Sequence, residues 1–323
     1  MSQEHILLTG ATGFIGYHVA GKLLAEGAHR VVAIVRGQGG RPDAKALEEK
    51  GAILLQGNFL DRDFIEEVFK NWPIRHVIHA AALRGGGLAN ENHYMEVNVR
   101  GTETLLDVAL QNGVDKFLFL SSVGVHGTIP PELPGTVRTV LSGDNLYHKS
   151  KVLAELRVNE FIKKGLNAYI IRPTITYGPR DNGFPKTLVE LVRKKMLLLS
   201  SEDIRIHLLD VESLANLVDK VIKSDGIKDR CFIAADRGPI SLRGLVNLIH
   251  RHYHGKDYPP SLRLPEGAFS LLLAAFRATG SEKWVTRILL ISQSWYYDIS
   301  ETMKAFSYSP ADTQEAFIRT MLS

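Results

Sequence analysis

The chain has 323 residues, of which 45% are hydrophobic, so it can build one large or two modest domains around a sizeable core. Its formal net charge is only +4, and the basic residues are scattered among acids instead of forming a stripe, which argues against a nucleic-acid-binding protein. Cys231 is the only cysteine, which excludes an intrachain disulfide, and nothing in the sequence suggests a metal site. Because Cys231 lies in an apolar run, we expect a buried structural thiol.

No basic leader precedes the first apolar run, and no cleavage site follows it. The longest apolar stretch, Phe269 to Phe276, is well short of the ~20 residues that a membrane span requires. We therefore expect a soluble, cytoplasmic protein with no signal peptide and no membrane span.

The first half of the chain alternates short apolar runs with helical patterns. The expected strands are Ile6–Leu8, Val31–Val35, Ile53–Gln56, His76–His79, Lys116–Leu120 and Ala168–Ile171. Helices are expected near residues 15–26, 62–70, 92–112 and 148–164. Continuously apolar strands with helices between them predict an α/β fold, a doubly wound parallel (Rossmann) sheet covered on both faces. Ligands bind beyond the carboxyl ends of the strands in such a sheet.

After Pro173 this alternation stops. Residues 174–205 have loop and helix patterns, followed by an expected strand at Ile204–Leu209 and a helix at 211–223, which we expect to return to the sheet, and then by the apolar run Cys231–Ala234. The remainder is helical and irregular. We expect a dinucleotide-binding domain of residues 1–172 plus 206–236, and a smaller, mostly helical substrate-binding domain of residues 173–205 plus 237–323.

A glycine-rich segment, Thr9–Gly16, directly follows the first strand and opens the first helix. Gly10, Gly13 and Gly16 have the spacing that permits a tight turn, close approach to a pyrophosphate and close helix–sheet packing, with phosphates at the helix N-terminus. Glycines also serve as plain turn residues, but the position between a strand and a helix favours a dinucleotide site.

Arg36 ends the second strand, 20 positions after Gly16. An NAD site usually has a carboxylate there to bind the ribose 2′-hydroxyl, whereas an arginine accommodates the 2′-phosphate of NADP. Arg36 is followed by a glycine-rich loop and Arg41. An ordinary solvated arginine is the alternative, but the absence of the acid favours NADP over NAD.

Tyr147 and Lys151 are separated by four positions, which places them on one face of a helix. A nearby ammonium group and a positively charged nicotinamide would favour the phenolate of Tyr147, so that it can exchange a proton with a substrate oxygen. Ser122 ends a strand and can hydrogen-bond the same oxygen. On spacing alone, two surface residues of an amphipathic helix would be the better interpretation.

Several ordered motifs give the chain a resemblance to the extended short-chain dehydrogenases/reductases, the NAD-dependent epimerase/dehydratase-like group. They extend over about residues 5–215 and are Thr9–Gly16, Gly57–Asp61, His79–Ala82, Asn98–Thr102, Ser121–Gly127, Tyr147 with Lys151, Arg172–Pro173, Tyr177–Pro179, and His207 with Asp210. Coincidence is a poor explanation for so many motifs in this order.

The resemblance implies roles for individual residues. Ser122, 25 positions before Tyr147, would be the catalytic serine in place of Ser121, acting with Tyr147 and Lys151. The implied cofactor-binding residues are Gly10, Thr12, Gly13, Phe14, Ile15, Gly16, Arg36, Asn58, Phe59, Ala80, Ala81, Ala82, Asn98, Tyr147, Lys151 and Pro173. Competing interpretations remain for three motif residues: Asp61 as a helix N-cap, Asn98 as a structural helix residue and His207 as a hydrogen-bonding residue between strand and helix.

Departures from the family pattern bear on the substrate. Thr174 stands where nucleotide-sugar enzymes of this group usually have Asn, and Asp203 stands where they have Arg. Asn58 replaces the more common Asp, and His126 replaces the common Tyr. These differences favour the 3β-hydroxysteroid dehydrogenase and dihydroflavonol reductase side of the group, with a less polar substrate.

The main hypothesis is therefore an NADP-preferring oxidoreductase that interconverts a secondary alcohol and a carbonyl compound. The enzymatic alternative is a nucleotide-sugar epimerase or dehydratase that recycles its NAD(P). The non-enzymatic alternative is an NADP-sensing or assembly protein, against which the intact Ser122, Tyr147 and Lys151 argue. The resemblance also implies a possible homodimer formed through helices 92–112 and 148–164.

Overall fold

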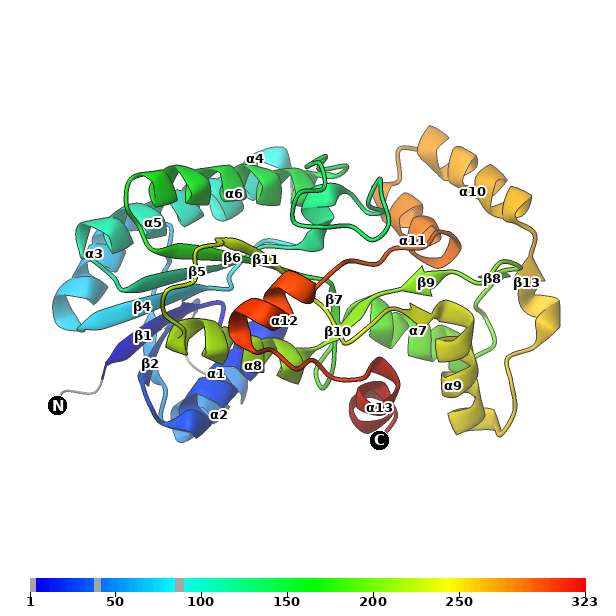
Figure 1. Cartoon of the computed structure of the whole chain (residues 1–323), viewed down its shortest axis with the longest axis horizontal. Coiled ribbons are helices and arrows are strands. Elements are labelled where there is room, and N and C mark those ends of the chain that lie inside the picture. The colour runs from blue at the N-terminus through cyan, green and yellow to red at the C-terminus, as the bar shows by residue number, and fades with distance from the viewer. Residues whose placement is uncertain (1–3, 38–41, 85–89) are drawn as a thin grey trace.

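A seven-stranded sheet occupies the centre of the computed structural model, which describes residues 4–37, 42–84 and 90–323 (Figure 1). The strand order is β11-β6-β5-β4-β1-β2-β3, and every pairing is parallel. The strands are β1 (His5–Thr9), β2 (Arg30–Val35), β3 (Ile53–Gln56), β4 (Ile74–His79), β5 (Lys116–Leu120), β6 (Ala168–Pro173) and β11 (Cys231–Ala234). The predicted doubly wound α/β fold is confirmed.

Helices cover both faces of this sheet (Figure 1). One face carries α1 (Phe14–Glu26), α2 (Pro42–Glu49), α8 (Val211–Lys223) and α12 (Ser300–Phe306). The other carries α3 (Arg62–Asn71), α4 (Glu91–Tyr94), α5 (Gly101–Gln111) and α6 (Leu146–Lys163). Successive strand residues point to opposite faces, so Ile6 and Leu8 pack in one core while Leu7 packs in the other. This explains why the strands are apolar throughout.

A second group of elements packs beyond the carboxyl ends of these strands, around a core that includes Tyr177, Leu245 and Trp295. Its helices are α7 (Phe184–Arg193), α9 (Leu242–His254), α10 (Glu266–Ala278), α11 (Glu282–Ser292) and α13 (Thr313–Phe317). Its short strands form the pairs β7 (Ile175–Tyr177) with β10 (Leu208–Asp210), β9 (Arg205–Ile206) with β12 (Ile240–Ser241), and β8 (Leu199–Ser200) with β13 (Arg263–Leu264). Short 3₁₀ turns lie at Val123–His126 and Pro260–Leu262, and a π-helical turn ends the chain at Ile318–Leu322.

The prediction of a single strand at Ile204–Leu209 was wrong. The structure divides it into β9 and β10, neither of which belongs to the central sheet, so only β11 returns there. His207 lies between the two strands, where its ring contacts the carbonyl of Asp236 at 2.9 Å and the amide of Tyr297 at 3.3 Å. These side-chain hydrogen bonds anchor the interruption, and they support the hydrogen-bonding interpretation of His207.

Three further details differ from the sequence-based prediction. Helix α2 was not expected, and neither were the short strands β7 and β8 within 174–205. The helix expected at 92–112 is divided into α4, a π-helical turn at Met95–Arg100 and α5. The expected burial of Cys231 is only partial, but it raises the pKa of the thiol to about 12, which disfavours the reactive thiolate. Among the described helices, none is both long and apolar enough to cross a membrane.

Candidate active site

The glycine loop lies at the carboxyl end of β1 and leads into α1. Gly10 has a φ of 77°, and a Cβ there would lie 2.7 Å from the amide nitrogen of Ala81. A Cβ at Gly16 would lie 2.0 Å from the carbonyl oxygen of Gly10. Both positions therefore require glycine. The N-cap of α1 is Gly13, and no side chain caps the helix, so its first amide groups face a space suited to a phosphate group.

The second strand ends beside this loop. Arg36 is exposed directly after β2, a position open to a ligand phosphate and equally to solvent, whereas Arg41 lies outside the described residues. Asn58 is also exposed, and its side-chain oxygen accepts a hydrogen bond from the amide of Leu60. Asp61 caps α3 by accepting from the amide of Phe64, which confirms the N-cap interpretation.

Ser122, Tyr147 and Lys151 converge on one cavity of about 280 Å³. Ser122 follows β5 and caps the 3₁₀ turn Val123–His126, while the other two residues lie one turn apart on α6. Asn145 begins α6 because its side chain accepts a hydrogen bond from the amide of His148. The cap fixes where the helix starts, and therefore the direction in which Tyr147 points.

Several residues expected at the cofactor line the same cavity, namely Ile15, Ala80, Ala82 and Pro173. Ala81 lies against Gly10. Two others are engaged elsewhere. Phe59 is 5% exposed and packs in the core against Gly101. Asn98 is buried, and its amide bonds the backbone of Leu83 and the hydroxyl of Ser150, which favours the structural interpretation of that side chain.

The electrostatics of Tyr147 differ from the simple expectation. Burial raises the pKa of its phenol above the usual value, while the charge of Arg84 and a hydrogen bond with Ser122 act in the opposite direction. The lowering of this pKa that was expected from Lys151 is therefore not found. A phenol held in its protonated form is poised to donate.

Lys151 is almost completely buried. Its Nζ donates to the carbonyl of Leu120 at 2.8 Å and lies 4.4 Å from the ring centre of Phe119. Burial lowers the pKa of the ammonium group to about 7; nearby Glu155 opposes this shift and Arg84 adds to it. Such a depressed pKa is typical of lysines at functional sites.

Two charged residues at the cavity were missed in the sequence, Arg84 and Asp181. Arg84 is exposed, but its charge acts on Tyr147, Lys151 and Asp181. Asp181 accepts hydrogen bonds from the amides of Gly183 and Lys186 and so supports the start of α7. Neither residue is part of a local motif, because they approach the cavity from segments almost one hundred positions apart.

A buried polar network adjoins the cavity, which its member Ser121 also lines. Ser121 donates to Glu155 at 2.6 Å, and Arg172 donates to both carboxylate oxygens of Glu155 at 2.9 and 2.6 Å. Arg172 also contacts the ring of His126 and donates to the carbonyl of Val137. This network joins the end of β5 to α6 and β6.

Thr174 also lines the cavity, just beyond β6. Its backbone amide bonds the carbonyl of Ala234, but its buried hydroxyl has no hydrogen-bond partner within the described residues. A second cavity of about 310 Å³ adjoins the first, since Thr128 and Thr286 line both. Arg277, at the end of α10, lines this second cavity.

Comparison with protein families matches residues 6–232 to the model described as the NAD dependent epimerase/dehydratase family. UDP-glucose 4-epimerase of Vibrio cholerae is 28% identical over 327 residues, covering 98% of this chain and 94% of that enzyme. UDP-glucose 4-epimerase of Erwinia amylovora is 32% identical over 164 residues, covering 49% of this chain and 48% of that enzyme. The match to the Erwinia enzyme thus spans about half its length.

The fold was also compared with solved structures. UDP-glucuronic acid 4-epimerase from Bacillus cereus in complex with NAD superposes with a TM-score of 0.76 at 19% identity. The superposition covers 98% of this chain and 96% of that one. At this identity the similarity establishes a shared fold.

Proposed function

Because the chain belongs to the NAD dependent epimerase/dehydratase family, within the extended short-chain dehydrogenases/reductases, we propose that it is a nicotinamide-dependent enzyme acting on a sugar nucleotide. The observation that carries the proposal is the convergence of Ser122, Tyr147 and Lys151 on the cavity that Ile15 and Pro173 also line. The relatives favour an epimerase or dehydratase over the net alcohol–carbonyl oxidoreductase that the sequence favoured.

The residues at the glycine loop fit a dinucleotide. Gly10 packs against the backbone of Ala81 and Gly16 against the carbonyl of Gly10, which keeps the turn tight, and the uncapped start of α1 offers amide donors to a pyrophosphate. When bound, the nicotinamide supplies the hydride acceptor and donor for the substrate carbon. Lys151, whose Nζ lies near the carboxyl end of β5, would hold the ribose hydroxyls.

The proton chemistry belongs to Tyr147. As the phenolate, Tyr147 would accept the proton of a substrate alcohol while the carbon is oxidised, and the phenol formed in this way would return the proton when the carbonyl is reduced. Ser122 hydrogen-bonds the same substrate oxygen and fixes its position beside the phenol. The positive charge of Arg84 and the hydrogen bond with Ser122 favour the phenolate and partly counter the effect of burial, which raises the pKa of Tyr147.

The adjoining second cavity supports a substrate larger than a simple alcohol. It extends the first past Thr128 and Thr286, and it is lined by one cation that can bind a phosphate group, Arg277, together with the carboxylates of Asp144 and Glu282. A sugar nucleotide would place its sugar beside Tyr147 and its diphosphate toward Arg277.

The experiment follows both substrate and cofactor. The protein is incubated with UDP-glucose and related sugar nucleotides plus NAD or NADP, with substrate or cofactor omitted in control reactions. Epimerised or dehydrated product without accumulation of reduced nicotinamide is the expected result. Stoichiometric accumulation of reduced nicotinamide, seen only with simple alcohols, would support the oxidoreductase instead.

That oxidoreductase remains the second candidate because of one observation. Thr174 lines the cavity and has a single, buried and unpaired hydroxyl, at the position where the family's nucleotide-sugar enzymes usually have the larger, bidentate amide of Asn. One hydroxyl suits a substrate with fewer polar groups.

The choice of cofactor rests on Arg36. We propose NADP because an exposed guanidinium stands where a carboxylate would select NAD, although the Bacillus cereus enzyme was solved with NAD. Replacing Arg36 by Ala should weaken NADPH binding about 10–100-fold, the effect of one charge-assisted hydrogen bond, and leave NADH binding unchanged. Equal affinities of the unaltered protein for both cofactors would refute the preference.

The domain boundaries given above, 1–172 plus 206–236 and 173–205 plus 237–323, stay a proposal, as does the homodimer. The second core, around Tyr177 and Trp295, supports a substrate-binding unit distinct from the sheet.

A further inference from the structure

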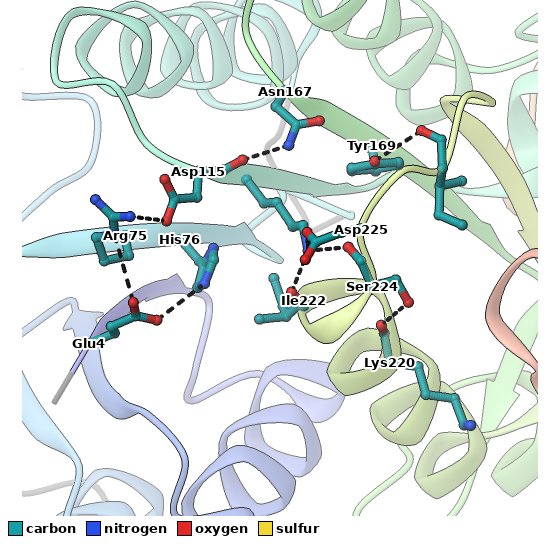
Figure 2. Close-up of polar contacts among 12 residues, drawn as sticks. Glu4, Arg75, His76, Asp115, Asn167, Tyr169, Lys220, Ile222, Ser224 and Asp225 are labelled. Carbon is teal, nitrogen blue, oxygen red and sulfur yellow. Dashed lines mark hydrogen bonds and ion pairs between the residues drawn. The ribbon is translucent and has the colours of Figure 1, made fainter.

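Three potential metal ligands meet at the amino-terminal edge of the central sheet, the end opposite the cavity. Glu4 directly precedes β1, His29 directly precedes β2, and His76 lies on β4. Because β1 pairs with both β2 and β4, these side chains come from three adjacent strands. Figure 2 shows the carboxylate of Glu4 between the side chains of Arg75 and His76.

The spacing of the three groups matches a small coordination sphere. The Oε2 atom of Glu4 lies 3.7 Å from Nδ1 of His29 and 4.0 Å from Nε2 of His76. All three potential ligand atoms lie within 4.8 Å of one another. Zinc–ligand bonds of ~2.0–2.1 Å in a tetrahedron place ligand atoms roughly 3.3 Å apart, so small side-chain rotations would complete the site.

Neither imidazole is fully satisfied by the protein around it. Nδ1 of His29, the atom that faces Glu4, is buried and makes no hydrogen bond within the described part of the chain. In His76 the buried atom without a hydrogen bond is Nδ1, whereas Nε2 faces Glu4. The two rings pack edge to face, with centres 5.4 Å apart.

A supporting contact orients the carboxylate. Nε of Arg75 lies 4.0 Å from Oε1 of Glu4, and the same guanidinium donates to Asp115 at 2.7 Å (Figure 2). Oε2 of Glu4 is thereby left facing the two histidines. Such outer contacts are typical of metal sites, where they hold a ligand in its binding orientation.

We propose that Glu4, His29 and His76 bind one divalent transition-metal ion, with zinc the best fit and water as the fourth ligand. Two imidazoles and one carboxylate are ligands that zinc accepts, whereas magnesium and calcium prefer oxygen alone. The site lies at the end of the sheet away from Tyr147, so its role is structural. The ion ties the segments that precede β1 and β2 to β4.

The test uses the full chain without a histidine tag, first freed of metal by a chelator. Zinc titrated by calorimetry should bind with one-to-one stoichiometry and raise the midpoint of thermal unfolding, because it binds only the folded chain. Cobalt should give the visible absorption of a tetrahedral site, and magnesium should have no effect.

Variants identify the ligands. Glu4→Gln and His29→Ala should each weaken zinc binding at least tenfold, because even the loss of an outer partner costs about 10–100-fold. Cofactor turnover should not change. His252→Ala, an exposed histidine on α9, is the matched control and should bind zinc normally.

Two results would overturn the proposal. One is unchanged zinc affinity in both Glu4→Gln and His29→Ala. The other is zinc binding that is lost when the neighbouring pair His250 and His254 on α9, whose ring centres lie 4.4 Å apart, is replaced instead.

Discussion

Two groups of polar side chains lie next to each other at the carboxyl end of the sheet, and the adjacent residues Ser121 and Ser122 belong to different groups. Ser121, Glu155, Arg172 and His126 are buried and hydrogen-bonded to one another, a closed network. Ser122, Tyr147, Lys151 and Thr174 line the cavity alongside Ser121 but lie outside that network, an open set. In the open set, the hydroxyl of Thr174 has no partner among the described residues.

This difference distinguishes residues that stabilise the fold from residues that are available for catalysis. A buried ion pair with all its hydrogen bonds satisfied holds the strands and α6 in place, and losing one partner leaves a buried charge. Groups with unused hydrogen-bonding capacity beside a cavity are instead available to a ligand. Substitutions in the closed network should therefore reduce the free energy of unfolding, and those in the open set should reduce turnover.

The largest effect on stability is expected for Glu155→Ala. It leaves the buried guanidinium of Arg172 without its carboxylate, which should cost about 3–5 kcal/mol in the free energy of unfolding. Glu160→Ala on the same helix is the matched control, because Glu160 forms an exposed pair with Arg157 worth about 0.2–1 kcal/mol. Denaturant unfolding measures both, and equal losses would contradict the distinction.

Lys151 should give the stability of the cofactor-free protein a pH dependence. Its pKa is about 7 in the folded chain because of burial, but about 10.4 when unfolded. The unfolded chain therefore binds an additional proton between these values, and stability should rise as the pH increases from about 7 to 10. Lys151→Met should remove this slope, whereas Lys149→Met, an exposed neighbour paired with Glu91, should keep it. An unchanged slope in Lys151→Met would refute the assignment.

The serine pair tests the comparison at adjacent positions. Ser121→Ala removes the hydrogen bond to Glu155 and should cost about 1–3 kcal/mol of stability with little change in turnover. Ser122→Ala should lower turnover roughly 10–100-fold, since it removes a hydrogen bond to the reacting oxygen. Thermal unfolding measures the stability of both variants, and steady-state kinetics measures their turnover. A reversed pattern would make Ser121 the catalytic serine.

The smallest effect is expected for Thr174→Val. Because the lost hydroxyl has no partner within the described residues, stability should change by less than about 0.5 kcal/mol, while KM should rise by a factor of about 2–10. Thr302→Val, which removes a buried hydroxyl bonded to the carbonyl of Ile233, should instead destabilise by about 1–3 kcal/mol. Similar stability losses in the two variants would place Thr174 in the closed network.

The sequence predicted best the features that depend on residues close together in the chain. Strands such as Lys116–Leu120 are apolar on both faces, and Asp61 is a recognisable cap, so their positions followed from pattern alone. The glycine loop was also recognisable from its spacing. The structure shows the reason for that spacing, because Gly10 and Gly16 have close backbone neighbours that exclude a Cβ.

What the sequence did not predict depends on distant contacts. The break at His207 depends on the carbonyl of Asp236, and the charge beside Tyr147 comes from Arg84, in another loop. The cluster of Glu4, His29 and His76 likewise exists only because three strands are adjacent. No local pattern in the sequence indicates these long-range contacts.

The most direct test of the account compares cofactor binding and turnover in Tyr147→Phe. The substitution keeps the ring and removes the hydroxyl, so the affinity for NADPH measured by fluorescence titration should stay unchanged. Turnover of the best substrate should fall about 10²–10⁴-fold, the usual contribution of a positioned acid or base. Undiminished turnover with intact cofactor binding would contradict the assignment of Tyr147 as the group that transfers the proton.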